Sequence, residues 1–190
     1  MNLLKKLTIN AIRLLTFVVF LCMSTLLFED LKIMSQFGFA LINSNEFSYE
    51  GCMSLSDKRD RGLCDWTDKT ISYYDKECDS CLIKKDHKRQ IIVSFDYLKP
   101  EILGSADMQN GQCHVHMQKY YPWEYDPLEF RLTLFHEIGH CIGFMHEQSK
   151  ESIMYYASSP LHKEKTVLDF VKGKFKDRLK NGFVFYNIFQ

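Results

Sequence analysis

The residues most able to do chemistry form one cluster between residues 136 and 146. This segment reads His136–Glu137–x–x–His140–x–x–Gly143–x–x–His146. Two imidazoles four residues apart share one face of a helix and can bind a single zinc ion at about 2.0–2.1 Å. Gly143 lets the chain leave the helix sharply, so that His146 can return as a third nitrogen ligand. Three neutral ligands leave the fourth zinc position open for water.

Glu137 follows the first predicted ligand directly, where its carboxylate lies beside the metal without binding it. A carboxylate in that place can remove a proton from the zinc-activated water, which is the chemistry of metal-assisted hydrolysis. The alternative is a core helix whose histidines form ordinary hydrogen bonds. The presence of both Gly143 and His146 argues against it, because a chance HExxH rarely carries these two residues as well.

The cluster lies on a predicted helix that runs from about Pro127 to Ile142. Asp126 suits the N-cap, proline suits the first helical position, and Gly143 suits the position just past the end. At 100° per residue, apolar residues cover most of the helix and leave His136 and His140 on the remaining sector. These apolar residues form a stripe of Leu128, Leu132, Phe135, Ile138 and Ile142, and a second patch of Phe130, Leu134 and Cys141.

Upstream of this helix, the sequence predicts a small sheet. Residues 52–64 are charged and predict a loop, and residues 163–180 predict a C-terminal helix with one apolar face. The predicted strands are Thr70–Tyr74, Gln90–Phe95, Leu103–Asp107 and Cys113–Met117, with an Asn110–Gly111 turn before the last.

Residues 1–30 have the pattern of a secretory signal. Three basic residues precede an uncharged run over residues 14–28, and two acids close it. We expect either a cleaved signal peptide or a retained signal anchor, followed by a spacer or short pro-segment over 31–50 and a catalytic domain over 51–190. The protein is therefore expected to be secreted, periplasmic or otherwise extracellular, with membrane attachment only through residues 14–28.

Length and charge limit the remaining possibilities. The 190 residues allow one domain plus appendages. Lysine and arginine together number 24, as do aspartate and glutamate, so the formal net charge is +0. Without a basic excess or a basic stripe, the sequence predicts no nucleic-acid partner.

Export changes the interpretation of the cysteines. Apart from Cys22 there are six, an even number that favours disulfides in an oxidising compartment. Several connectivities are open, and the first hypothesis pairs Cys52 with Cys64, Cys78 with Cys81, and Cys113 with Cys141.

A second motif, Ser152–Ile153–Met154–Tyr155–Tyr156, follows the histidine cluster. Together the two motifs resemble the metzincin clan of zinc peptidases, in which a long zinc motif precedes a methionine turn. The resemblance implies that Met154 lies under the metal without binding it and that Tyr156 stabilises the transition state. The residues after Gly143 are similar to astacins, but the short spacing from His146 to Met154 is similar to matrixins, so the subfamily stays open.

The resemblance also implies a fold and an activity. The fold would be α+β, with a small twisted mixed sheet packed on the active-site helix and a C-terminal helix. The activity would be that of an exported endopeptidase with one catalytic zinc, its substrate bound as an extended strand along Leu103–Asp107. Clan members carry a long helix between the first two strands, and the short interval over residues 75–90 predicts that it is shortened or missing here. The oligomeric state stays open.

Two other functions use the same residues. A catalytically silent, zinc-stabilised module would hold a protein without cutting it, and would usually lack Glu137. A zinc hydrolase of a non-peptide amide would keep it.

Three minor features complete the sequence. His114 and His116 share one strand face and would need a third ligand to bind a second metal, so ordinary side chains are the simpler interpretation. His87 and His162 are expected at the surface. Cys52 ends a segment similar to the astacin latency element, with cysteine in place of aspartate, and it is either a zinc-blocking thiolate or half of a disulfide with Cys64.

Overall fold

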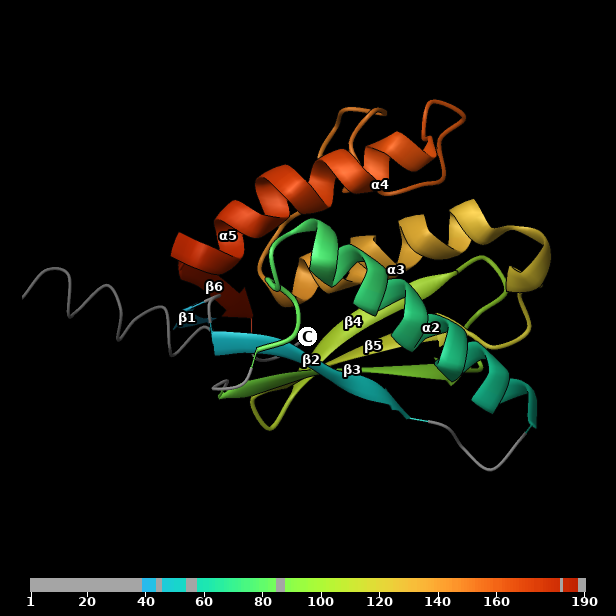
Figure 1. Ribbon diagram of the computed structural model, residues 1–190, viewed down its shortest axis with the longest axis horizontal. Helices are drawn as coiled ribbons and strands as arrows, with labels where there is room; N and C mark the ends of the chain where they lie inside the picture. The colour runs from blue at the N-terminus through green and yellow to red at the C-terminus, as the bar shows by residue number, and fades with distance from the viewer. Residues whose placement is uncertain (1–38, 44–45, 54–57, 85–87, 182, 188–190) are drawn as a thin grey trace, which may run out of the picture. The chain divides into compact units, whose positions relative to one another are not determined.

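The computed structural model describes residues 39–43, 46–53, 58–84, 88–181 and 183–187 (Figure 1). The predicted signal segment and His87 lie outside the described residues. The chain divides into two units, and the larger one, which includes Leu41–Tyr186, contains the candidate site.

Four strands form one mixed sheet in the order β2-β3-β5-β4. β3 is parallel to both β2 and β5, whereas β4 is antiparallel to β5 and lies at an edge. The predicted Asn110–Gly111 turn joins β4 to β5, and both residues have the positive φ that a two-residue hairpin turn requires. The strands are β2 (Phe47–Met53), β3 (Arg89–Asp96), β4 (Gly104–Gln109) and β5 (Gln112–Gln118).

The sheet begins upstream of the predicted domain boundary, because β2 starts at Phe47 and the boundary was expected at residue 51. A separate two-stranded sheet pairs β1 (Phe39–Asn43) with β6 (Phe183–Asn187).

A long helix, α2 (Lys58–Glu77), lies between β2 and β3. The prediction of a strand over Thr70–Tyr74, of a loop reaching residue 64 and of a shortened or missing helix is therefore wrong. β-branched and aromatic residues favour strands locally, but here they recur with helical spacing and pack on the sheet, and packing overrides propensity. The residues buried along α2 are Asp60, Leu63, Cys64, Thr67, Thr70, Ile71, Tyr74 and Asp75.

The main core lies between the sheet and two helices that cover the same face, α2 and α3 (Pro127–Cys141) (Figure 1). α2 packs on β2 and β3, and α3 packs on β4 and β5. Alternate residues of the central strands point toward the helices, as expected for a sheet covered on one side. These buried residues are Ile91, Val93 and Phe95 of β3, and Cys113, Val115 and Met117 of β5.

The predicted C-terminal helix is present as a helical tail with a kink at Gly173, whose φ of −101° and ψ of −105° are not helical. The tail packs on α3 and α2. Val171, Phe175 and Leu179 are buried along it, and the Phe175 ring lies 6.2 Å from that of Phe135 in α3. α3 is thus covered by the sheet on one side and by the tail on another, which is the predicted α+β architecture. The tail consists of α4 (Glu164–Phe170), the π-helical turn η3 (Val171–Phe175) and α5 (Lys176–Asn181).

All three disulfides pair as the sequence hypothesis expects. Cys52–Cys64 joins β2 to α2, and Cys78–Cys81 closes the turn after α2. Cys113–Cys141 joins β5 to the last residue of α3, with Cα atoms 5.6 Å apart. The third bond fixes the end of α3 to the sheet.

Candidate active site

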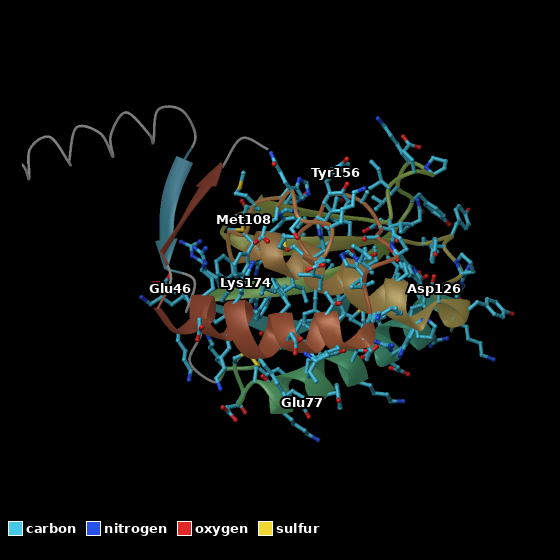
Figure 2. All side chains as sticks on the ribbon, turned by 90° about the horizontal axis from the view of Figure 1, so that it is seen from above. Glu46, Glu77, Met108, Asp126, Tyr156 and Lys174 are labelled. Atoms are coloured by element: carbon cyan, nitrogen blue, oxygen red, sulfur yellow. A yellow bond between two sulfur atoms is a disulfide. The ribbon has the colours of Figure 1, made fainter. Side chains whose placement is uncertain are left out.

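The helix that carries the motif begins and ends where the sequence predicts. The Asp126 side chain accepts a hydrogen bond from the Glu129 backbone N–H at 3.1 Å, and Pro127 occupies the first turn. Figure 2 shows Asp126 at the start of α3. At the other end Ile142 caps the helix, and Gly143 has a φ of +82°, which a side chain would strain.

This geometry brings the three predicted ligands together. The Nε2 atoms of His136 and His140 lie 3.1 Å apart, and each lies 3.2 Å from the Nε2 atom of His146. In the part of the chain that the structure describes, these histidines form the single group of three or more metal-ligating side chains close enough to share one ion.

Two backbone carbonyls fix which ring nitrogens carry protons. His136 Nδ1 lies 2.7 Å from the Ile153 carbonyl oxygen, and His140 Nδ1 lies 2.8 Å from that of Phe144. Because a carbonyl only accepts, both Nδ1 atoms must be protonated, and in neutral rings both Nε2 atoms then carry lone pairs. Lone pairs that face each other at this distance repel unless a cation lies between them. The donor set therefore fits a zinc ion.

Burial keeps these rings in the neutral form that metal binding needs. It lowers the pKa of His136 to about 4, against the opposing effect of the Ile153 hydrogen bond. Burial also lowers the pKa of His140. Both imidazoles are thus available as ligands at neutral pH.

Backbone hydrogen bonds return His146 to the helix. The Phe144 N–H bonds to the Gly139 carbonyl at 3.0 Å, which turns the chain back after Gly143. The Glu147 N–H donates to the Met154 carbonyl at 2.8 Å, so the residue after His146 is tied to the methionine turn.

The tail helix holds the same segment from outside. Lys174 Nζ lies 2.9 and 3.0 Å from the two carboxylate oxygens of Glu147. This lysine lies on the helical tail in Figure 2. The hydrogen bond with Lys174 lowers the pKa of Glu147, so the ion pair persists into mildly acidic solution.

Glu137 is buried between α3 and the edge strand. Only 7% of the residue is exposed, and burial raises the pKa of its carboxyl to about 7. A methyl group added at Gly104 of β4 would lie 2.8 Å from Glu137 Cγ and 2.8 Å from Thr133 Cγ2. A glycine is therefore needed where the edge strand passes this carboxylate. No sequence motif marks Gly104 as part of the site.

Met154 is fully buried against the motif helix. A methyl group added at Gly139, between His136 and His140, would lie 2.6 Å from Met154 Sδ. The methionine thus packs on the helical turn that carries the first two histidines.

Tyr156 lies in a different environment. It is 69% exposed, and its ring packs on Tyr155 with centroids 4.5 Å apart. A hydrogen bond with Tyr156 raises the pKa of the Tyr155 hydroxyl. The role of Tyr156 in stabilising the transition state stays a prediction.

Two further histidines have defined partners. His162 is buried, contrary to the surface position we expected, because its Nε2 bonds to the Ser152 carbonyl at 2.9 Å. No sequence spacing could reveal a bond between a side chain and a distant carbonyl. His116 Nδ1 lies 2.7 Å from an Asp96 carboxylate oxygen and 3.1 Å from Ser94 Oγ, as an ordinary polar side chain would.

Comparison with known families gives one match. A family model described as Matrixin matches residues 65–171, more than half of the chain. The matched range includes most of α2, strands β3 to β5, the three histidines and the methionine turn. No curated protein and no solved structure shows a significant match.

Proposed function

Because the chain belongs to the matrixin family, within the metzincin clan of metallopeptidases, we propose that it is a zinc-dependent endopeptidase. The observation that carries the proposal is the triangle of Nε2 atoms, 3.1–3.2 Å apart, on rings whose Nδ1 atoms must be protonated. His136, His140 and His146 would hold the ion. When bound, zinc would lower the pKa of a water molecule toward about 7, so that the water can act as a nucleophile near neutral pH. The ion would also polarise a carbonyl group.

Glu137 would move the proton. Burial raises the pKa of this carboxyl to about 7 in the metal-free protein, and the positive charge of a bound zinc ion would favour the carboxylate, the form that accepts a proton. It takes a proton from the attacking water as the new C–O bond forms at the peptide carbonyl carbon. It then gives that proton to the amine nitrogen as the C–N bond breaks. Tyr156 would donate a hydrogen bond to the carbonyl oxygen as negative charge develops there.

The edge strand β4 is the proposed docking site for the substrate backbone. One side of β4 pairs with β5, and no described strand pairs with its other side. An extended peptide can bond to such an edge, as the sequence predicts for Leu103–Asp107. At Gly104 this strand passes directly beside Glu137, which would place a scissile bond near the buried carboxylate.

We also propose that the protein is exported through residues 1–30, with residues 14–28 as the only means of membrane attachment. The cysteine pairs support this, because disulfides form and persist in oxidising compartments. Among the described residues, no helix is both long enough and apolar enough to span a bilayer.

The test replaces Glu137 with glutamine and measures zinc content and cleavage of a peptide library together. We expect Glu137→Gln to fold and to hold zinc as the unmodified protein does, because the amide keeps the shape and removes no ligand. Cleavage should fall by about 10²–10⁴-fold, as for loss of a general acid–base group. Glu124→Gln, an exposed change on the short helix η2 (Trp123–Tyr125), is the matched control and should cleave normally.

Near-normal cleavage by Glu137→Gln would contradict the proposed mechanism. If the unmodified protein binds zinc and a peptide but cleaves none, the catalytically silent module is the better description. If it cleaves only non-peptide amides, the substrate class is wrong.

A further inference from the structure

We propose, on the basis of the function proposed above, that His162 is a positioning residue that fixes His136 in its zinc-binding orientation. It would act through the turn that contains Met154. His162 touches neither the substrate nor the metal in this proposal, and the three ligands remain those already described.

The intermediate is a four-residue turn from Ser152 to Tyr155. The Tyr155 N–H donates to the Ser152 carbonyl at 3.0 Å, which closes the turn and leaves Ile153 and Met154 at its centre. The Ile153 carbonyl is not used by the turn, and it accepts the hydrogen bond from His136 Nδ1 at 2.7 Å.

His162 holds the first carbonyl of the same turn. Its Nε2 lies 2.9 Å from the Ser152 oxygen, and since that oxygen only accepts, Nε2 must carry the proton. His136 and His162 thus donate to consecutive carbonyls, those of Ile153 and Ser152. The two peptide planes meet at the Cα atom of Ile153, so the φ and ψ angles of this one residue set how the two carbonyls are oriented relative to each other.

Burial makes the His162 bond hard to replace. The residue is only 8% exposed, and its own backbone N–H bonds to the Ser159 carbonyl at 3.0 Å, so the imidazole is held between the turn and the segment before α4. Without the imidazole, the Ser152 oxygen keeps the Tyr155 N–H but loses its side-chain donor. The turn would then relax, and the Ile153 carbonyl would no longer hold His136 in place.

Groups that orient metal ligands typically change metal affinity by about 10–100-fold when removed. His162 does not bond to a zinc ligand itself but to the carbonyl next to the one that His136 uses. We therefore expect about a tenfold increase in the zinc dissociation constant for His162→Phe, at the low end of that range. This variant keeps a ring of similar size and lacks the donor. His162→Gln places an amide N–H at a reach similar to Nε2 and should stay within about threefold of the unmodified protein.

The measurement is competition for zinc against a chromogenic chelator, together with the melting temperature of the metal-free protein. His162→Asn carries the same amide as glutamine on a shorter side chain, so it should behave as the phenylalanine variant does. If His162→Phe does not fold, the comparison of the asparagine and glutamine variants decides. His114→Phe, on β5, is the control for removing an imidazole and should bind zinc normally.

Unchanged zinc affinity in the phenylalanine and asparagine variants would overturn the proposal, even if their metal-free forms melt earlier, because His162 would then be purely structural. A glutamine variant as weak as the phenylalanine variant would overturn the role of the N–H donor. If the unmodified protein binds no zinc, the function proposed above fails, and that outcome is distinct from either of these.

Discussion

At the scale of single residues, close packing surrounds the proposed catalytic carboxylate. Gly104 of the edge strand lies against Glu137 and Thr133, and Gly139 of α3 lies against Met154. A carboxylate held in this way loses little orientational freedom when a substrate binds, which favours proton transfer in a fixed direction. The glycines are thus part of the site although they carry no reactive group.

Gly104→Ala tests this packing. The added methyl group would lie 2.8 Å from Glu137 Cγ, a distance at which the glutamate or the strand must move. Overpacking of this kind costs about 1–3 kcal/mol of stability. We expect kcat for peptide cleavage to fall at least about tenfold, with normal zinc content, because even a small displacement of a catalytic group lowers the reaction rate.

Gly51→Ala is the matched control for the edge glycine. It is also in a strand, and an added methyl group there meets no atom within 4 Å. Equal kcat values in the two alanine variants would show that Gly104 does not position Glu137.

Residue spacing made most of the site predictable. The distances in sequence between His136, His140 and His146 are set by helix geometry and one glycine turn, so they predict a shared site directly. The role of Gly104 depends on which strand lies at the sheet edge, and that of His162 depends on a backbone carbonyl. Neither dependence leaves a pattern in the sequence.

At the scale of elements, α2 shows where local pattern and packing disagree. Thr70–Tyr74 has strand-favouring residues, yet Leu63, Thr67, Ile71 and Tyr74 lie four or three residues apart and form one buried helical face. These residues recur with the helical period in the sequence, but the charged residues between them favour the interpretation of the segment's first part as a loop. By contrast, α3 was predictable because its Asp126 cap and Gly143 mark both ends.

The disulfide between β2 and α2 provides the test at this scale. Replacing both Cys52 and Cys64 with serine should lower the stability of the folded protein by about 2–4 kcal/mol, since the bond joins residues 12 apart in sequence and restricts the unfolded chain. Peptide cleavage per folded molecule should not rise. Thermal melting and an activity assay on the full chain measure both effects.

The zinc-blocking hypothesis for Cys52 requires the reverse result. If its thiolate restrained the site, the double serine variant would gain activity while its melting temperature stayed nearly constant. The disulfide in the structure favours the first outcome.

At the scale of the whole molecule, the order of layers explains how the parts meet. α3, which carries the first two histidines, lies between the sheet and the helical tail and packs on β4, β5 and α4. Cys113–Cys141 joins the sheet to the end of that helix, and Lys174 joins the tail to Glu147 beside the third histidine. The resemblance to metzincins implied the layers, but the strand order depends on long-range pairing that no local signal specifies.

The central claim is that one zinc ion, held by three histidines, makes this protein an endopeptidase. The most direct test adds zinc stepwise to metal-free protein and records bound metal and cleavage of a fluorogenic peptide library in the same samples. Cleavage should rise in proportion to bound zinc and stop rising at one zinc per chain. Full occupancy without cleavage, or equal cleavage by the metal-free protein, would contradict it.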